Sequence, residues 1–497
     1  MRIGEYAQTA EHAELTPAAR VSIAAALLVG LALRLFFAWR YPFDSGDTFY
    51  YKSLADNWLY HGVYGLYANG QLFPEDMRVP GYPAFIAGMH ALFGLNDFAT
   101  RVAQCLLDMV TCVLTASLAA LISPRPSRHK VFLGALWLAA LCPFTANYTA
   151  AMIAETLATL ATCAALLCLA HAHAASTTAL TETEARRNGT ARAAVLWFSS
   201  GLLAGLGTLV RPETPILLAP FLLLLFLQGY RRHGWSRMWL CGLWSIAGLA
   251  ICLSPWAARN VLSVGEVQFL APRYAETSGD FISRGFYAWA QTWLDRYDYA
   301  HSVIWKVNRE PIELGVLPPQ AFDSPEERSD TGALLEQYNA KRFMTPPLDC
   351  AFAELARART RRNPVRTYVW IPVQRALALW FTPRVELLPF EPLLWPPKGE
   401  PRNNPPGFPI ADVFELLQIA YAVLALAGAW RQRANSLAVA LLLFIAIRTA
   451  ILTQFQTVEP RYVIECFPAL IALGAQAWSM PFDELLAVSP QKSAPIS

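Results

Sequence analysis

Long apolar runs recur along the chain and are separated by short polar stretches. A helix of about 20 apolar residues crosses the ~30 Å hydrocarbon core of a bilayer, so each run predicts a membrane span. The runs cover residues 21–39, 98–122, 131–149, 151–172, 193–210, 213–229, 237–255, 411–430, 436–453 and 462–480. The pattern therefore predicts an all-α polytopic membrane protein. No small-residue cleavage site follows the first run, which we interpret as a retained span and not a signal peptide.

The composition supports this class and excludes others. Of the 497 residues, 55% are apolar and 15% are charged, whereas soluble proteins carry about 25% charged residues. The 40 basic and 37 acidic residues give a net charge of +3, which is too small to indicate a nucleic-acid partner. The nine cysteines include no CxxC pair and no zinc-ligand spacing, so neither disulfides nor a metal site is predicted.

Lysine and arginine in the short loops predict the orientation, because such loops resist translocation. Basic loops at 123–130, 181–192, 230–237 and 431–435 are predicted to be cytoplasmic. The chain then divides into a cytoplasmic tail (1–20), a transmembrane module (21–256) with an outer loop (41–97), an outward-facing segment (257–410), C-terminal transmembrane helices (411–480) and a cytoplasmic tail (481–497). The number of membrane crossings agrees with this orientation only if the amphipathic stretch 368–381 does not cross the membrane and is instead re-entrant or interfacial. A full span with a different C-terminal topology is the alternative.

Two carboxylates, Asp44 and Asp47, lie in the outer loop directly after the first span. A carboxylate at the membrane boundary can be partly desolvated, which raises its basicity, and it still reaches a substrate from the aqueous side. Asp47 is therefore a candidate general base. Aspartate is also favoured as an N-cap, so either residue could instead cap a helix running from about Thr48 to Tyr60.

Arg78 stands before a turn in the same loop, Pro80-Gly81-Tyr82-Pro83. Two prolines around a glycine favour a sharp re-entry toward the second span. The fork of donors on a guanidinium beside this turn could bind a phosphate through two hydrogen bonds. A turn followed by an interfacial arginine and tyrosine explains the same residues.

The outer ends of later spans carry further charges. Glu155 lies about one turn into its span, where the helix dipole favours an acid, and an acid at membrane depth indicates function. The other polar residues at outer ends are Arg211, Glu213, Arg259, Asn260, Glu459, Arg461 and Tyr462. Convergent arginines suit a phosphate, although a dipole-stabilising glutamate and an ordinary interfacial belt are the alternatives. Arg34 and Asp108, inside the first two spans, are interpreted as a buried ion pair or, for Arg34, as snorkelling.

Taken in order, these motifs resemble the GT-C superfamily of membrane glycosyltransferases, in its branch of protein mannosyltransferases and lipid A aminoarabinose transferases. The motifs are Asp47 with Tyr51 and Ala55 at +4 and +8, Arg78-x-Pro-Gly-Tyr82-Pro83, Ala-Glu155-Thr, Arg211-Pro-Glu213, Pro255-Trp-x-x-Arg259-Asn260 and Glu459-Pro-Arg461-Tyr462. The resemblance covers about residues 20–265 and 455–475.

The resemblance implies a GT-C-like bundle of about 10–12 transmembrane helices with outward-facing loop helices, a polyprenyl-phosphate-linked sugar as donor, and inversion at the anomeric carbon. It implies that Asp47 is the base, that Arg78, Arg259 and Arg461 stabilise the departing phosphate, and that Glu155 orients the acceptor or sugar. The remaining residues of the matched motifs would bind substrate: Tyr51, Tyr82, Arg211, Glu213, Asn260, Glu459 and Tyr462.

The chain departs from the family at one position, and its sequence does not identify the acceptor. Many relatives carry an Asp-Glu pair in the first loop, whereas Thr48 follows Asp47 here, so either Asp44 or Glu155 would complete the acidic pair. No cofactor is expected, and a divalent metal is not excluded. The acceptor is a lipid, a glycan or a protein. The expected location is the bacterial inner membrane, with the active site on its outer, periplasmic face.

Two other functions fit part of the pattern. A polysaccharide polymerase or ligase shares the lipid-linked donor and a large outer loop, but relies chiefly on outer-loop arginines and histidine. A lipid or solute transporter explains the spans and interior charges. It does not require a 57-residue loop (41–97) and about 150 further residues on the same side.

Overall fold

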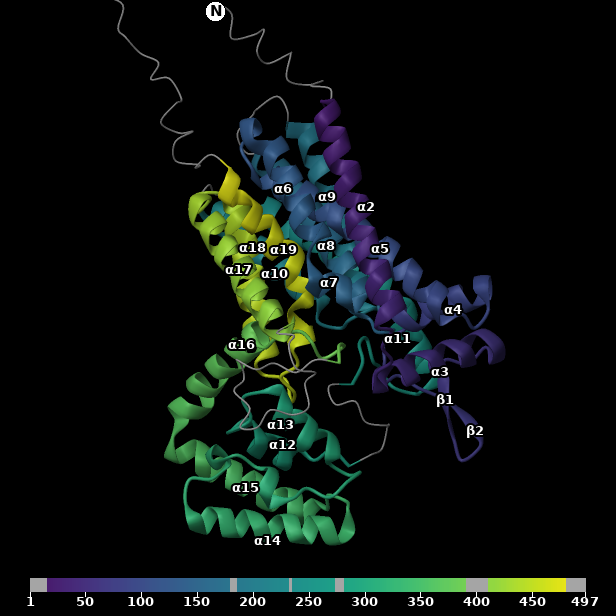
Figure 1. The fold of residues 1–497 in the computed structure, drawn as a ribbon, viewed down its shortest axis with the longest axis vertical. Helices are drawn as coiled ribbons and strands as arrows, with labels where there is room; N and C mark the ends of the chain where they lie inside the picture. The colour runs from purple at the N-terminus through teal and green to yellow at the C-terminus, as the bar shows by residue number, and fades with distance from the viewer. Residues whose placement is uncertain (1–15, 179–185, 232–234, 273–280, 390–409, 480–497) are drawn as a thin grey trace, which may run out of the picture.

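The computed structural model describes residues 16–178, 186–231, 235–272, 281–389 and 410–479. Its helices form a long bundle that carries a smaller helical domain at one end (Figure 1). Most of the predicted tail 1–20 and all of the predicted tail 481–497 lie outside the described residues.

The bundle is built from helices that run along its length. They are α2 (Pro17–Arg40), α5 (Asp97–Ile122), α6 (Arg128–Ala140), α8 (Glu155–Thr178), α9 (Arg186–Thr208), α10 (Leu218–Arg231), α11 (Trp235–Ser263), α17 (Ile410–Arg431), α18 (Ser436–Leu452) and α19 (Phe467–Gly474). Within the described ranges, five helices are long and apolar enough to cross a bilayer unaided, and shorter apolar helices accompany them. The prediction of an all-α polytopic membrane protein is confirmed.

Three predicted spans are broken where the sequence suggested continuous helices. The run 131–149 splits into α6 and a short helix, α7 (Pro143–Tyr148), because Pro143 cannot donate a backbone hydrogen bond within a helix. The run 151–172 becomes helical only at Glu155, which begins α8 and does not lie a turn inside it. The last run starts as a 3₁₀ helix, η7 (Pro460–Cys466), continues as α19 and ends as η8 (Ala475–Trp478).

The first outer loop forms two helices and a hairpin at the end of the bundle opposite to the N-terminal end of α2 (Figure 1). Helix α3 (Gly46–His61) is followed by strands β1 (Gly65–Ala68) and β2 (Gln71–Pro74) and by helix α4 (Gly81–Phe93). The strands pair antiparallel from Gly65 opposite Pro74 to Ala68 opposite Gln71. Asn69 and Gly70 both have positive φ, as a two-residue hairpin turn requires.

The second outer segment forms the helical domain at the same end. Its elements are α12 (Arg284–Gln291), α13 (Tyr297–Ser302), η3 (Ile304–Lys306), η4 (Leu314–Val316), η5 (Pro319–Ala321), α14 (Pro325–Lys341) and α15 (Pro346–Arg362). Buried aromatic side chains, including Trp289, Trp293 and Phe352, form a hydrophobic cluster that also includes Leu452 of α18 and Val463 of η7. The core of this segment therefore continues into the end of the bundle.

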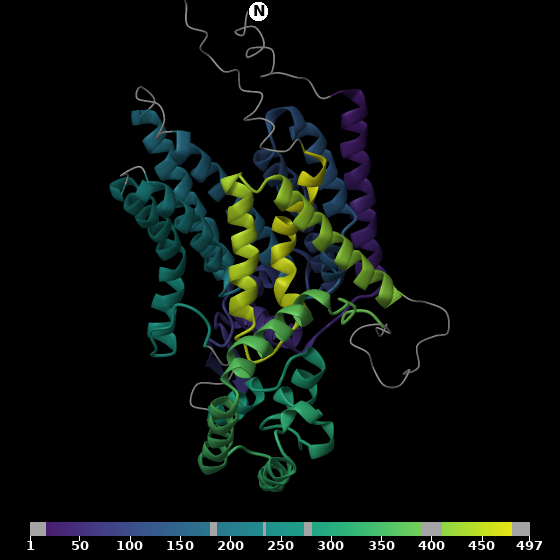
Figure 2. The same ribbon diagram turned by 90° about the vertical axis from the view of Figure 1, so that its left-hand side faces the viewer.

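The stretch predicted to be re-entrant or interfacial joins this domain to the bundle. A π-helix, η6 (Arg366–Trp370), leads into α16 (Ile371–Phe381), which packs on η7, α17 and α18 and does not run the length of the bundle (Figure 2). Arg375 is buried and donates hydrogen bonds to the carbonyls of Leu294, Thr453 and Phe455. Arg375 thus fastens the outer domain to the end of the bundle and does not lie at a lipid surface.

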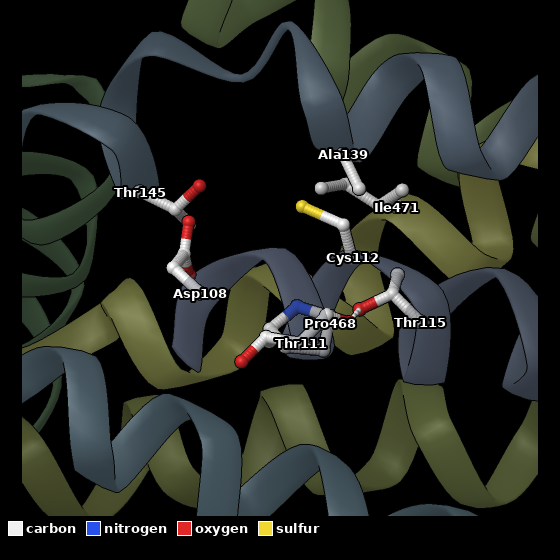
Figure 3. Close-up of a pocket in the computed structure, with 8 residues that line it drawn as sticks. All are labelled: Asp108, Thr111, Cys112, Thr115, Ala139, Thr145, Pro468 and Ile471. Carbon is white, nitrogen blue, oxygen red and sulfur yellow. Dashed lines mark hydrogen bonds between the residues drawn. The ribbon is translucent and has the colours of Figure 1, made fainter. Parts of the chain in front are cut away.

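Deep in the bundle, Arg34 and Asp108 form a buried ion pair, with Arg34 donating to Asp108 at 2.7 Å. The same guanidinium donates to the carbonyls of Ala139 and Ala140 at the C-terminal end of α6, where a positive charge is stabilising. Beside the pair is a cavity of about 10 Å³, roughly the room that one water needs. Figure 3 shows the residues that line it: Asp108, Thr111, Cys112, Thr115, Ala139, Thr145, Pro468 and Ile471.

Helices α9 and α11 approach closely because glycines face backbone at their contact. A Cβ added at Gly248 would lie 2.2 Å from the carbonyl oxygen of Phe198, and one added at Gly201 would lie 1.9 Å from that of Ser245. Small residues allow this approach between membrane helices.

We expect Gly248→Ala to force these two helices apart and lower the free energy of unfolding by about 1–3 kcal/mol, as overpacking does. The measurement is the apparent melting temperature in detergent. The matched control is Gly242→Ala in the same helix, where the nearest atom would be 4.0 Å away. Equal melting temperatures for the two variants would contradict the close α9–α11 contact.

Candidate active site

At the end of the bundle that carries the helical domain, charged side chains from five segments of the chain meet. The segments are the start of α3, the loop before α4, the start of α8, the turn after α9, and the turn that leads into η7. Each lies at the end of a helix, where backbone groups leave the regular hydrogen-bond pattern.

Asp47 lies between two arginines. Arg78 Nη2 donates to its Oδ1 at 2.8 Å, and Arg461 Nη2 donates to its Oδ2 at 2.9 Å. Asp47 stands in the first turn of α3, but the helix is capped by Ser45, whose backbone N–H donates to the hydroxyl of Thr48. The alternative in which Asp44 or Asp47 is the cap is therefore wrong.

The environment of Asp47 favours its charged form. Burial alone would raise the pKa of this carboxyl, but the charges of Arg461 and Arg78 and their hydrogen bonds outweigh burial and hold the pKa well below its usual range. Both oxygens are thus occupied by charged donors, and Asp47 is ionised at every physiological pH.

Arg78 is fixed by the loop that carries it. The hydroxyl of Tyr64 donates to the carbonyl of Arg78 at 2.8 Å, and the N–H of Gly81 donates to the carbonyl of Leu209 at 2.5 Å. A Cβ on Gly81 would lie 2.4 Å from that carbonyl oxygen, so only glycine permits this contact. The turn predicted around Pro80–Pro83 therefore ties Arg78 to the end of α9.

Glu155 is presented by a non-helical strap, residues 149–154, between α7 and α8. The strap pairs with Phe43 through Ala151, and its carbonyls accept hydrogen bonds from Arg101, Gln104 and Thr48. These bonds satisfy backbone groups that the missing helix leaves open. Glu155 is 2% exposed and begins α8, where the helix dipole favours its charge.

Two arginines hold Glu155 in the cluster. Arg211 Nη1 donates to Glu155 Oε1 at 3.0 Å, and Arg461 Nη1 lies 3.5 Å from the same oxygen. Arg211 also lies 3.1 Å from Glu213, and Arg461 donates from Nε to Glu459 at 2.6 Å. Arg461 therefore touches three acids from three segments of the chain.

Three predicted tyrosines surround these charges. Tyr462 donates to Glu459 at 2.6 Å, and its ring lies 5.4 Å from the guanidinium of Arg211. Tyr51 packs edge-on against Tyr82 at 4.9 Å between ring centroids. Burial, followed by the charge of Asp47, raises the pKa of Tyr51 to about 12, so its hydroxyl stays protonated.

Three predicted site residues do not join the cluster. Asp44 pairs instead with Arg101 at 2.8 Å and its side chain is half exposed. Arg259 donates to the carbonyls of Tyr64 and Glu75 and to the side chain of Asn260, while Asn260 donates to the carbonyl of Gln268. In this structure Arg259 and Asn260 thus support the hairpin that leads to Arg78.

Two charged residues of the cluster were not predicted. Arg448 donates to Glu465 at 2.6 Å, and Glu465 lies 3.6 Å from Arg211. Both are single charges inside the apolar runs 436–453 and 462–480. That isolation is the signal that could have identified them.

The cluster combines hydrogen-bond donors for an anion with carboxylates that are paired to them. The acids Asp47, Glu155 and Glu459 each have an arginine partner. Within the described ranges there is no group of three or more histidine, cysteine, aspartate or glutamate side chains that could hold a metal ion. Three arginines of the cluster provide donors for a phosphate, and Asp47 beside them is a carboxylate that can accept a proton once its arginine partners are drawn away.

Comparison with known proteins identifies one family model that matches part of the chain. Residues 77–258, which contain Arg78, Tyr82, Glu155, Arg211 and Glu213, match the model of the dolichyl-phosphate-mannose-protein mannosyltransferase family. The match covers less than half of the chain, and over this segment it agrees with the resemblance inferred from the motifs. No individual curated protein matches the chain by sequence.

Solved structures of two enzymes are similar to this chain. The oligosaccharyltransferase AglB from Archaeoglobus fulgidus, in complex with an inhibitory peptide and a dolichol-phosphate, is 14% identical with a TM-score of 0.50, covering 97% of this chain and 53% of that chain. A second structure of the A. fulgidus enzyme, in complex with Zn and sulfate, is 13% identical with a TM-score of 0.46, covering 95% and 51%. ArnT from Cupriavidus metallidurans is 14% identical with a TM-score of 0.39, covering 93% and 78%.

These comparisons bear on the fold. The helical bundle is similar in fold to AglB, and this chain spans about half the length of that oligosaccharyltransferase. The family match and the apolar helices together identify an integral membrane protein.

Proposed function

We propose that the protein is an inverting glycosyltransferase that moves a sugar from a polyprenyl-phosphate-linked donor to an acceptor at the outer face of the membrane. The observation that carries this proposal is the pairing of Asp47 with Arg78 and Arg461, which combines a proton acceptor with two phosphate-binding groups. The family match over residues 77–258 supports the same class of reaction.

In the proposed reaction, the acceptor oxygen or nitrogen attacks the anomeric carbon of the donor sugar. Its proton passes to the carboxylate of Asp47 as the new glycosidic bond forms. The bond between the anomeric carbon and the phosphate oxygen breaks, and its electron pair leaves with the polyprenyl phosphate. Arg78 and Arg461 stabilise the charge that develops on this leaving oxygen.

Glu155 is the second acid of the proposed site. Arg211 and Arg461 both reach Oε1 of Glu155, and Arg461 also contacts Asp47, so one guanidinium connects the two acids. Asp44 is instead paired with Arg101. We therefore assign to Glu155 the orientation of the sugar or acceptor. The acceptor class, whether a lipid, a glycan or a protein, is left to the assay.

The proposal gives no role to a metal, because the acids of the cluster already have arginine partners. Transfer is expected to continue in the presence of a chelator. The oligosaccharyltransferase structure with Zn makes this control worth including in every assay.

We expect Asp47→Asn to abolish transfer while preserving the fold, because asparagine keeps the shape of aspartate but cannot take up the proton. A general base typically contributes about 10²- to 10⁴-fold to the rate. The measurement is the passage of radiolabelled sugar from a pool of polyprenyl-phosphate hexoses and pentoses into a total membrane fraction, using purified protein in proteoliposomes.

The matched control is Asp97→Asn, which removes a carboxylate that pairs with Lys52 in the same outer region. It should transfer sugar within about twofold of the unsubstituted protein, since exposed pairs contribute little. Equal transfer by Asp47→Asn and Asp97→Asn would remove Asp47 from the mechanism. No transfer by the unsubstituted protein from any donor would favour the transporter.

The pairing of Asp47 predicts different pH dependences for kcat/KM and kcat. The first reports ionisations of the free enzyme and the second those of the complex. The pKa of Asp47 in the free protein lies below its ordinary value of about 3.9, so kcat/KM should have no acid limb from this group above about pH 5. In the complex the donor phosphate draws Arg78 and Arg461 away, the pKa of Asp47 rises, and the acid limb of kcat moves to higher pH. Coincident acid limbs would show that the arginines stay on Asp47.

The outward orientation can be tested with Cys350, which is exposed on α15 of the outer domain. A membrane-impermeant maleimide should label it in intact cells, because the basic loops predict that the opposite end of the bundle is cytoplasmic. Cys350→Ser should remove this labelling. Labelling that requires permeabilised cells would place the cluster on the cytoplasmic side.

A further inference from the structure

A buried ion pair, Arg448 with Glu465, contacts Arg211 and Glu213 of the cluster. Arg448 is on α18 and Glu465 is on η7, and they are 0% and 1% exposed. The guanidinium donates from Nη2 to Glu465 Oε1 at 2.6 Å. Burying such a pair usually contributes little to stability, because desolvation offsets the attraction between the charges. Its place beside the site therefore indicates another role.

The pair contacts the proposed site through Arg211 and Glu213. Glu465 Oε1 lies 3.6 Å from Arg211 Nε, and Arg448 Nη2 lies 3.7 Å from Glu213 Oε1. Glu213 is itself 3.1 Å from Arg211 Nε. The four side chains therefore alternate in charge, and each cation faces both acids.

Glu465 is also tied to the helix that begins with Glu155. Its second oxygen accepts a hydrogen bond from Thr162 at 3.0 Å, and Thr162 lies two turns further along α8. Arg211 links Glu155 to this pair, because its Nη1 donates to Glu155 while its Nε faces Glu213 and Glu465. The orientation of the Arg211 guanidinium thus depends on Glu213 and Glu465, on the side away from Glu155.

We propose that Arg448 and Glu465 are positioning residues that orient Arg211 so that it holds Glu155 in the transfer site. This inference rests on the proposed glycosyltransferase function. Neither residue need touch the substrate. Without the charge of Glu465, Arg448 would draw Glu213 away from Arg211, because these two groups are already 3.7 Å apart. Arg211 would then lose two of its three acidic neighbours together.

The decisive variant is Glu465→Gln, which removes the charge and keeps the size of the side chain. We expect kcat to fall about 10- to 100-fold, as misplacement of a group by about 1 Å does, with the donor KM within about twofold of the original value. If the effect acts through Glu155, adding Glu465→Gln to a Glu155→Gln protein should lower kcat less than twofold further. Full additivity of the two changes would overturn the inference.

The matched control is Asp108→Asn, the equivalent change in the other buried pair of the bundle. It should lower the melting temperature as much as Glu465→Gln does, or more, and leave kcat within about twofold. A loss of kcat in Asp108→Asn equal to that in Glu465→Gln would show that any broken ion pair impairs the enzyme. That result would also overturn the inference.

Two further measurements keep the outcomes separate. Should Glu465→Gln not fold, Glu465→Asp keeps the charge on a shorter side chain and is expected to show the same coupling to Glu155→Gln, with a smaller loss. A cryo-EM structure of the folded Glu465 variant tests the inference without an activity assay. Arg211 should no longer contact Glu155 in it, and an unchanged contact would refute the positioning role. Absence of transfer by the unsubstituted protein would instead refute the proposed function.

Discussion

The contact on which the outer end of the bundle depends is that of Arg461 with acids from three segments. Its guanidinium reaches Asp47 from the first outer loop, Glu155 at the start of α8 and Glu459 beside it in the chain. In a partly buried setting, opposite charges at about 3 Å attract far more strongly than in water. Each segment is therefore held in place by charges on the others, and the position of each charged side chain depends on its partners in the other segments.

The helices around this contact end early, and these ends create the site. The strap 149–154 is non-helical, so its carbonyls are free to accept hydrogen bonds from Arg101, Gln104 and Thr48. Those bonds set the position at which α8 begins, and Glu155 is its first residue. In the same way, the contact of Gly81 with the carbonyl of Leu209 joins the end of α9 to the loop that carries Arg78. Non-helical backbone at this depth is tolerated because protein groups satisfy it.

The sequence predicted the features that depend on local composition. Apolar runs identified the bundle, and charged residues at the outer ends of those runs included Asp47, Arg78, Glu155, Arg211 and Arg461, which the structure brings together. It did not predict partners that lie far apart in the chain. Asp44 pairs with Arg101, which is 57 residues away, and Arg259 turns to carbonyls almost 200 residues earlier. Arg448 and Glu465 are also single charges in apolar runs, and their pairing with each other and with Arg211 and Glu213 depends on contacts that the sequence pattern does not specify.

The resting arrangement also constrains the order of events in the proposed reaction. Asp47 cannot accept a proton while both of its oxygens receive hydrogen bonds from guanidinium groups, since each bond stabilises the charged form. A phosphate competes for the same donors, because its oxygens accept bidentate bonds from arginine as a carboxylate does. Arrival of the donor therefore weakens the hold on Asp47 at the place where a proton acceptor is needed. An acceptor that arrived first would meet a carboxylate already saturated by charge, so we expect the lipid-linked donor to bind before the acceptor in the proposed reaction.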